Sequence, residues 1–321
     1  MNAREEHRAS GFGAADMLLL LMTLIWGINY TVLKQSLIEF QPLAFNGLRF
    51  IIASALTIIF TVSTGRNFKL ERGDLPRLWA LGLLANTVYQ SLFIVGMAHT
   101  SAGNAALILA TTPLFTALIG RLRRSEFFTN AGVAGLVLAF AGMAAIILSG
   151  PKGVSIRDDL TGDSLMVACT ICWSIYTSFT KGYVHKYGAL KTTTIMMITG
   201  TPVLLLVSSG SLATQDWSAV HRAAWAGLFF SGALAIGLAY IIWNNGVQKI
   251  GSTRTALYSN VTPIIALIVA WIVLSETPTW GQLVGAAVIF VGIYMVRNGM
   301  THAAPEEATE EERVTLRPGK N

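Results

Sequence analysis

Trp26-Gly-Ile-Asn-Tyr-Thr-Val-Leu-Lys34 returns in altered form as Trp173-Ser-Ile-Tyr-Thr-Ser-Phe-Thr-Lys181, at an offset of 147 residues. Further identities follow at an offset of 150. They pair Gly96, Ala106, Leu107, Thr112, Pro113, Ser125, Glu126, Gly135, Phe140 and Gly142 with Gly246, Ala256, Leu257, Thr262, Pro263, Ser275, Glu276, Gly285, Phe290 and Gly292. Such a duplication inside a hydrophobic chain is typical of membrane carriers built around a pseudo-two-fold axis.

The composition indicates a membrane protein. Of the 321 residues, 53% are hydrophobic and 12% are charged, whereas about a quarter of the residues of a soluble domain are charged. The mean hydropathy is +0.56. The net charge of +6 does not indicate nucleic-acid binding, because the basic residues lie in short loops between apolar spans and not on one face of a folded domain.

Ten apolar spans are long enough to cross a bilayer. The first half contains 16–34, 42–64, 75–97, 102–121 and 130–149, and the second contains 163–182, 190–209, 223–245, 253–274 and 280–297. If the N-terminus is cytoplasmic, the cytoplasmic segments hold 15 Lys and Arg residues before the C-terminal tail, and the external segments hold four. This asymmetry predicts that both termini are cytoplasmic. Because each half has five helices, the two repeats are then inverted.

The predicted fold is therefore an all-α polytopic membrane protein with ten transmembrane helices in two inverted five-helix repeats. Its segments are a cytoplasmic N-terminus at 1–15, a first repeat at 16–149, an external linker at 150–162, a second repeat at 163–297 and a disordered cytoplasmic tail at 298–321. The apolar run after Met17 continues to Leu33 without a cleavage site, so we interpret it as a retained helix and not as a signal peptide.

Acidic residues are expected at helix ends, in loops and in the tail. Asp16 and Asp163 are equivalent in the duplication and are predicted to cap the helices that they begin. Glu126 and Glu276 are predicted to anchor the N-terminus of the helix that follows each of them. A carboxylate inside a span often serves proton coupling. Its expected absence weighs against simple proton antiport and leaves gradient-driven export open.

Several motifs resemble those of EamA-type transporters, which belong to the drug/metabolite transporter superfamily. They are Pro113-Leu-Phe-Thr-Ala with Arg-Arg-Ser-Glu126, Thr262-Pro263-Ile-Ile-Ala with Leu-Ser-Glu276, Trp26-Gly27 with Asn29, Pro42 with Leu-Arg49-Phe50, and Ala239-Tyr240 with Trp243 and Gly246. The resemblance covers nearly all of residues 14–297. It implies a five-plus-five inverted repeat and an exporter of amino acids, metabolites or drugs, without implying one substrate.

Polar and aromatic side chains inside the spans are the candidate substrate-binding residues, because such groups are costly in lipid and usually face a cavity or a partner. They are Trp26, Asn29, Tyr30, Arg49, Asn86, Tyr89, Gln90, Trp173, Tyr176, Tyr240, Asn244, Tyr258 and Asn260. For the amides, hydrogen bonding between helices is the alternative. For the aromatic residues, the alternative is the interfacial belt, although Trp26 lies about 15 Å into its helix, near mid-bilayer.

Arg49 has two readings. It can hold a substrate carboxylate or a gate from the pocket, or it can extend to the interface or bond to carbonyls of a neighbouring helix. Its equivalent position holds Met196, and the equivalent of Asn29 is Tyr176. The halves thus differ at positions expected to line a path, which suits an asymmetric substrate.

Two kinds of paired residue suggest structural roles. Pro113 and Pro263 are predicted at equivalent mid-helix positions, either as structural kinks or as hinges for alternating access. Glycines recur in the fifth and tenth spans and predict close helix packing within one chain. They are Gly132, Gly135, Gly142, Gly281, Gly285 and Gly292.

The predicted function is that of a secondary transporter in the bacterial inner membrane, which exports small organic solutes from a central cavity. The expected partners are a small-molecule substrate and the lipid bilayer, with a monomer or weak homodimer and no nucleic acid; no cofactor or metal is expected. A receptor or scaffold without transport is the main alternative. An intramembrane enzyme is a weaker one, because the histidines near helix ends lack a companion catalytic pattern. No Walker A motif is present, so the chain is not itself an ATPase.

Overall fold

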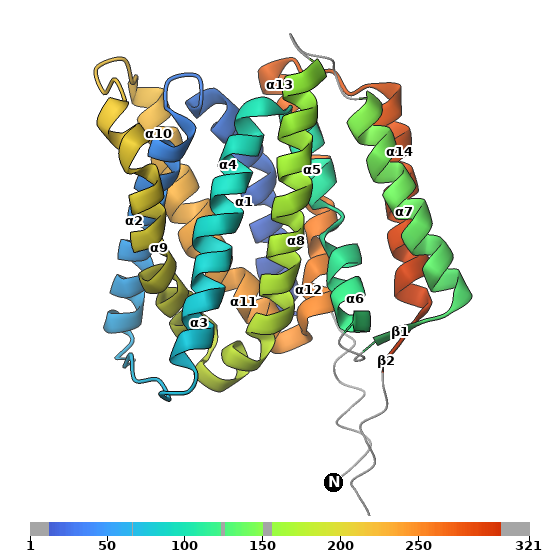
Figure 1. The fold of residues 1–321 in the computed structure, drawn as a ribbon, viewed down its shortest axis with the longest axis horizontal. Coiled ribbons are helices and arrows are strands. Elements are labelled where there is room, and N and C mark those ends of the chain that lie inside the picture. Colours follow the sequence, from blue (N-terminus) through green and yellow to red (C-terminus); the bar gives the residue numbers. More distant parts are fainter. Residues whose placement is uncertain (1–12, 66, 123–125, 150–155, 303–321) are drawn as a thin grey trace, which may run out of the picture.

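The computed structural model describes residues 13–65, 67–122, 126–149 and 156–302, and shows a bundle of helices (Figure 1). Most of the predicted N-terminal segment, most of the predicted tail and about half of the predicted linker lie outside these residues. The first half comprises α1 (Ala14–Ser36), α2 (Pro42–Ser63), α3 (Leu75–Gly82), η2 (Leu83–Val88), α4 (Tyr89–His99), α5 (Ala102–Leu109), α6 (Thr112–Leu122), β1 (Glu126–Phe128) and α7 (Asn130–Ser149). The second comprises α8 (Ile156–Tyr187), α9 (Ala189–Thr214), α10 (Arg222–Phe230), η3 (Ser231–Leu238), α11 (Ala239–Ile250), α12 (Ser252–Tyr258), η4 (Ser259–Val261), α13 (Thr262–Leu274), α14 (Trp280–Asn298) and β2 (Met300–His302).

Eight helical segments of the described chain are long and apolar enough to cross a membrane. They coincide with eight of the ten predicted spans. The other two predicted spans correspond to α8, which has 32 residues, and to a shorter apolar stretch at Trp280–Val296 in α14. The all-helical class is confirmed, apart from one short antiparallel pair formed by β1 and β2. The crossing of a membrane by all ten helices stays a prediction.

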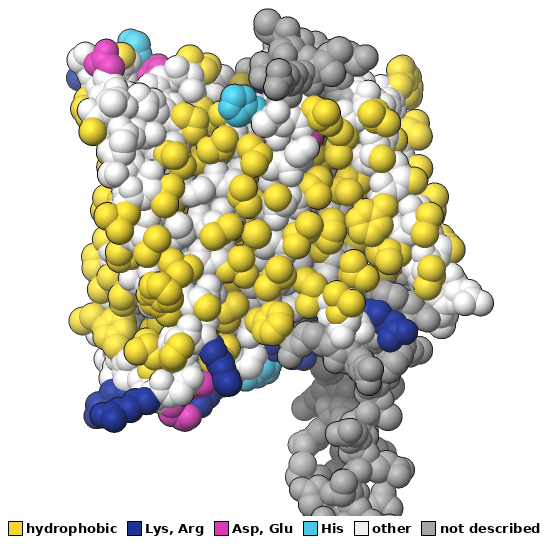
Figure 2. Space-filling view, viewed as in Figure 1, with side chains coloured by type: hydrophobic (Ala, Val, Ile, Leu, Met, Phe, Trp, Pro, Cys, Tyr) yellow, Lys and Arg dark blue, Asp and Glu magenta, His cyan; other side chains and the backbone are white. Residues whose placement is uncertain are grey.

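The outer surface of the bundle is apolar in the way that a lipid-facing protein requires. Figure 2 shows hydrophobic side chains over the middle of one face, with Lys and Arg side chains gathered at one end. Leu206 and Ile272 are each 73% exposed, and Ile59 is 61% exposed. Exposed apolar area of this extent marks a surface that contacts something other than water, here a bilayer.

Two π-helical segments interrupt otherwise regular helices. η2 joins α3 to α4, and η3 joins α10 to α11, so both lie in the third apolar span of their half. π-helical turns are rare and often occur at functional sites. The sequence pattern did not predict them, because it specifies which face of a helix is apolar but not a local change of pitch.

The helices that contain the paired prolines are broken. α5 ends at Leu109 and α6 begins at Thr112, while η4 separates α12 from α13, so Pro113 and Pro263 lie in the first turns of α6 and α13. The predicted mid-helix positions are therefore wrong. A first turn tolerates proline because the missing N–H would have no intrahelical acceptor there. Thr111 donates its hydroxyl to the Ile108 carbonyl and thus satisfies an acceptor near the break.

Glycines allow α7 and α14 to pack closely, as predicted. A Cβ on Gly142 would lie 2.8 Å from the Gly285 carbonyl oxygen, and one on Gly135 would lie 2.7 Å from the Gly292 carbonyl oxygen. The two helices stand together at one edge of the bundle (Figure 1). Side chains larger than hydrogen at these points would push the backbones apart.

The expected caps have mixed outcomes. Asp16 caps its helix as predicted, since its Oδ2 accepts a hydrogen bond from the Gly13 N–H at 2.7 Å. Asp163 does not begin a helix. α8 starts at Ile156, and Asp163 is 1% exposed and accepts hydrogen bonds from Thr100 and from Asn104 Nδ2 (3.2 Å). The expectation that acidic residues lie only at helix ends, in loops or in the tail is therefore wrong at this position.

Glu276 anchors a helix N-terminus, but not that of the following helix. Its carboxylate oxygens accept hydrogen bonds from the N–H groups of Ala102 and Gly103, at 3.4 and 3.3 Å, at the start of α5. α14 has its own capping box, in which Thr279 and Gln282 bond reciprocally. A carboxylate is stabilised near any helix N-terminus. Tertiary packing places the N-terminus of α5, and not that of α14, next to the Glu276 carboxylate.

Candidate substrate-binding site

A chamber of about 50 Å³ lies inside the bundle, between the two halves of the chain. Helices α1, α2, α4, α5, α6, α8 and α11 contribute to its wall, together with η3 and residues near the break before α13. Eight of the thirteen candidate residues line it. They are Trp26, Asn29, Tyr30, Arg49, Tyr89, Gln90, Trp173 and Tyr240.

Arg49 is the charged group of this chamber, and it is 1% exposed. Its Nε donates to Asn46 Oδ1 at 2.9 Å, its Nη1 donates to Ser231 Oγ at 3.0 Å, and its Nη2 donates to Gln90 Oε1. The ring of Phe93 lies 5.6 Å from the guanidinium carbon, within the range of a cation–π contact. Arg49 is thus held inside the bundle and does not extend to the interface.

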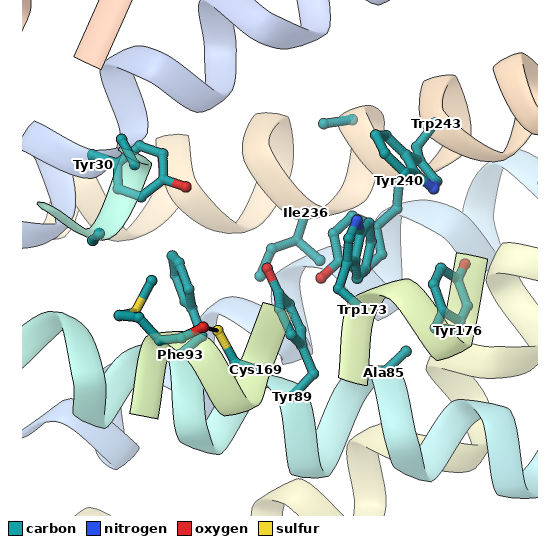
Figure 3. Close-up of a cluster of buried hydrophobic side chains, with 14 of the residues drawn as sticks. Tyr30, Ala85, Tyr89, Phe93, Cys169, Trp173, Tyr176, Ile236, Tyr240 and Trp243 are labelled. Atoms are coloured by element: carbon teal, nitrogen blue, oxygen red, sulfur yellow. Dashed lines mark hydrogen bonds between the residues drawn. The ribbon is translucent and has the colours of Figure 1, made fainter. Parts of the chain in front are cut away.

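Aromatic rings form the rest of the wall. Trp173 is central, with ring centroids 5.0 Å from Tyr89, 5.0 Å from Tyr240, 5.4 Å from Trp243 and 6.0 Å from Trp26. Figure 3 shows Trp173 among the rings of Tyr89, Tyr240 and Trp243. Such a cluster offers flat apolar surfaces, with hydroxyl groups at the edges of the tyrosine rings.

The π-helical segment η3 is tied to this aromatic wall. Trp26 donates its indole N–H to the carbonyl oxygen of Ala235 at 2.8 Å, and Ala235 lies within η3. Ser231, which accepts from Arg49, lies in the same segment. η3 therefore supplies the chamber with both a side-chain and a main-chain acceptor.

Two buried polar atoms on chamber-lining residues have no hydrogen-bond partner among the described residues. They are Asn29 Oδ1 and Thr262 Oγ1. Buried polar atoms are almost always paired with protein or water. Unpaired atoms in a hollow of this size are therefore positions where water or a bound solute would form hydrogen bonds.

The other five candidates lie outside this chamber. Asn86 donates to the Met196 carbonyl oxygen at 2.7 Å and holds η2 against α9. Tyr176 and Asn244 bond to each other, and Asn244 Nδ2 also donates to Thr193 Oγ1 at 2.7 Å.

Tyr258 and Asn260 are the remaining two. The Tyr258 hydroxyl donates to Asp16, which joins the residues before the α13 break to the start of α1. Asn260 Oδ1 is buried without a partner in the described structure.

A second and larger hollow, of about 1120 Å³, lies at the end of the bundle where α3 begins and α8 ends. We call it the vestibule. Residues of α6 and α8 line both hollows. On α6, Thr112 lines the chamber and Thr116, one turn later, lines the vestibule. On α8, Trp173 lines the chamber and Ile175 lines the vestibule. Its basic lining residues are Arg77, Lys181, Lys186 and Arg254.

One of these cations is neutralised by acidic neighbours. Lys186 Nζ lies 2.7 Å from Asp74 Oδ2 and also pairs with Glu71. The hydrogen bonds from Lys186 and then from Tyr187 lower the pKa of Asp74 below its usual value. The pairs connect the start of α3 to the end of α8 at the vestibule rim.

Sequence reasoning missed part of this site. Asn46 and Ser231 hold the Arg49 guanidinium, and Phe93 faces it. The i, i+3 spacing of Asn46 and Arg49 was a usable signal, because such residues share a helix face. Ser231 lies 182 residues from Arg49, and no local pattern connects them.

The apolar helices define a multi-pass membrane protein, and this one contains an internal chamber and a vestibule. A model of the EamA-like transporter family matches the chain twice, at residues 13–148 and 160–298. The chain belongs to the EamA-like transporter family. The resemblance inferred from the motifs is confirmed.

Relatives are similar over most of their length. The uncharacterized transporter YyaM of Bacillus subtilis (strain 168) is 27% identical and covers 86% of this chain and 91% of its own. A probable amino-acid metabolite efflux pump of Salmonella typhimurium (strain LT2) is 27% identical, covering 87% and 93%. A probable terminal-alkyne amino-acid exporter of Streptantibioticus cattleyicolor is 25% identical, covering 92% and 97%.

A solved crystal structure shares the fold. It superposes with a TM-score of 0.65 at 16% sequence identity, and the match covers 87% of this chain and 94% of the other.

Proposed function

We propose that this protein is a secondary transporter that exports small organic solutes by alternating access through the central chamber. The observation that carries the proposal is a pair of hollows within the bundle: a buried chamber with a fixed cation, aromatic walls and unpaired polar atoms, and a wide vestibule at one end that is lined by residues of α6 and α8 as the chamber is. Ligand sites of membrane carriers occupy such positions between repeats.

The proposed architecture is ten transmembrane helices in two inverted five-helix repeats, at 16–149 and 163–297, with both termini cytoplasmic. The double family match and the paired identities support this division. In this arrangement the vestibule faces the cytoplasm, because Arg77, Lys181 and Arg254 lie on the side that the charge asymmetry assigns to it. The proposed location is a bacterial inner membrane.

Alternating access requires the repeats to move, and the broken helices offer the points of movement. Neither α5–α6 nor α12–α13 has continuous α-helical bonding across its break, and each break is followed by a proline. Hinges commonly lie at the ends of elements. We assign Pro113 and Pro263 to these hinges.

Relatives named for the efflux of amino-acid metabolites and terminal-alkyne amino acids support an exporter of small organic molecules. The test is counterflow of labelled amino acids and related acids in proteoliposomes, with and without a pH gradient. Saturable exchange above that of empty liposomes is expected for at least one solute. Folded protein that exchanges none of them would favour a receptor or scaffold.

A further inference from the structure

The charge of the chamber indicates which solute it accepts. Arg49 is buried and its three hydrogen-bond acceptors are the neutral groups of Asn46, Ser231 and Gln90. Within the described part of the chain, neither an ion pair nor a hydrogen bond joins Arg49 to a carboxylate. A buried charge with only neutral partners is costly, and an incoming anion would offset that cost.

The described lining of the chamber contains no acidic residue, so its fixed charge is that of Arg49 alone. The guanidinium has five N–H donors, and three are engaged by the neutral acceptors. The remaining donors can bond to a carboxylate, for which the planar guanidinium is a geometric match.

The described lining of the vestibule is also positively charged. Arg77, Lys181 and Arg254 line it, and its described lining also lacks Asp and Glu. Lys186 forms ion pairs with Glu71 and Asp74 at the rim, and the positive charges of Arg77 and Arg254 also act on the carboxylates of Asp74 and Asp16. A hollow lined by one sign of charge between low-dielectric walls concentrates ions of the opposite sign, so the lining of both hollows favours anions.

The body of the solute must fit the aromatic wall. The rings of Trp173, Tyr89 and Tyr240 contact one another and line the chamber, and Phe93 lies next to the guanidinium. Flat apolar groups gain from offset or edge-on contact with such rings. Asn29 Oδ1 and Thr262 Oγ1 are left to bond to a polar substituent or to water.

We propose that the transported solute is a monocarboxylate anion with an aromatic or similarly flat apolar body, bound with its carboxylate at Arg49 and its body against the Trp173 wall. This rests on the proposed transport function and names its substrate class. A zwitterion is disfavoured relative to the anion, because the ammonium group would enter a chamber whose described lining carries a positive charge and no negative one. The single positive charge of Arg49 balances one carboxylate, so a monocarboxylate is favoured over a dicarboxylate.

The test uses three probes that share a phenyl ring and a two-carbon linker but differ in charged group: 3-phenylpropionate, L-phenylalanine and phenethylamine. Each is measured for saturable flux in proteoliposomes, above empty liposomes, and for the shift that it causes in melting temperature in detergent. We expect flux and a melting-temperature increase with 3-phenylpropionate, a weaker response to phenylalanine, and none to phenethylamine. An equal or stronger response to phenethylamine or phenylalanine would overturn the proposal without any variant being needed.

Variants assign the effect to Arg49. R49Q removes the charge and R49K keeps it, while R222Q removes an exposed charge at the start of α10, away from the chamber. R49Q should reduce the response to 3-phenylpropionate at least about tenfold, since a charge-assisted hydrogen bond is lost. R49K should retain part of it and R222Q all of it. Equal responses in R49Q and R222Q would refute the assignment.

The two readouts separate this inference from the transport function. If 3-phenylpropionate raises the melting temperature through Arg49 but no probe is transported, the binding inference stands and the transport proposal fails. If transport is saturable but does not depend on the charge of the probe, transport stands and the anion inference fails.

Discussion

The contact between α2 and η3 resembles the contact between α9 and the end of α3 in its backbone packing, but the two contacts differ in their side chains. A Cβ on Gly232 would lie 2.8 Å from the carbonyl oxygen of Arg49, and a Cβ on Gly82 would lie 3.0 Å from that of Met196. The glycines are equivalent at the offset of 150, and Arg49 and Met196 are equivalent at 147. In both halves, the third span packs its glycine against the same point of the other half's second span.

The side chains at these points differ. Arg49 projects its guanidinium to Gln90 and Ser231 at the chamber, whereas the sulfur of Met196 lies 3.9 Å from Thr180 Oγ1. Both contacts therefore have the same backbone packing, but only the contact between α2 and η3 places a charged side chain, Arg49, at the chamber. Close packing restricts residues to glycine, and the neighbouring side chain is free to differ.

The largest expected effect comes from filling either glycine contact. G82L or G232L places side-chain atoms where backbone lies about 3 Å away, and backbone cannot yield as a flexible side chain can. We expect each variant to lose about 3 kcal/mol or more of stability and to give little monodisperse protein by size-exclusion chromatography. G210L is the matched control on α9, because nothing lies within 4 Å of its Cβ position. Normal behaviour of either filled variant would break the equivalence of the two contacts.

A sharper test exchanges the chemistry and keeps the packing. R49M gives α2 the residue that α9 has at the equivalent position. Transport of 3-phenylpropionate should fall at least about tenfold, because no cation remains in the chamber. M196L is a near-isosteric control and should change stability by less than about 1.5 kcal/mol and leave transport intact. The measurements are proteoliposome flux and melting temperature, and full transport by R49M would remove the functional difference between the contacts.

The prolines test whether the two halves also move alike. P113A and P263A should each extend the helical bonding across its break and slow transport several-fold at normal expression, because a continuous helix is a poorer hinge. Melting temperature serves as the control for folding. Wild-type transport rates in both variants would show that Pro113 and Pro263 are not hinges. Slower transport in one variant alone would assign the hinge movement to the repeat that contains that proline.

The smallest effects are expected at Asn29 and Tyr176, the second pair of mismatched equivalents. Y176F removes the hydroxyl that bonds to Asn244 and should cost about 1 kcal/mol of stability with little loss of transport. N29L removes an unpaired buried oxygen, so stability should be maintained while transport falls. Melting curves and flux are measured on both variants. Loss of transport in Y176F with normal transport in N29L would assign the functional role to Tyr176 instead of Asn29.

Much of this arrangement could be predicted from residue patterns. The apolar spans, the Asp16 cap and the close packing of α7 with α14 follow from hydrophobicity, capping chemistry and the spacing of small residues, which are local properties. The sequence showed a proline, Pro113, inside an apolar run. It did not show that the helix ends before this proline and that a new helix begins there. A proline excludes a continuous regular helix without specifying where the interruption lies.

The sequence by itself determined the class and the duplication, because composition and periodicity decide which segments can be buried in lipid, and it contains the charge asymmetry from which we propose an orientation. Tertiary structure alone decided where the polar groups of those segments go. Glu276 reaches the N-terminus of α5, which lies 174 residues earlier, Asp163 is enclosed by Thr100 and Asn104, and Arg49 meets Ser231. Each pairing joins elements far apart in the chain, and a buried charge or dipole is satisfied by whichever partner the packing brings near.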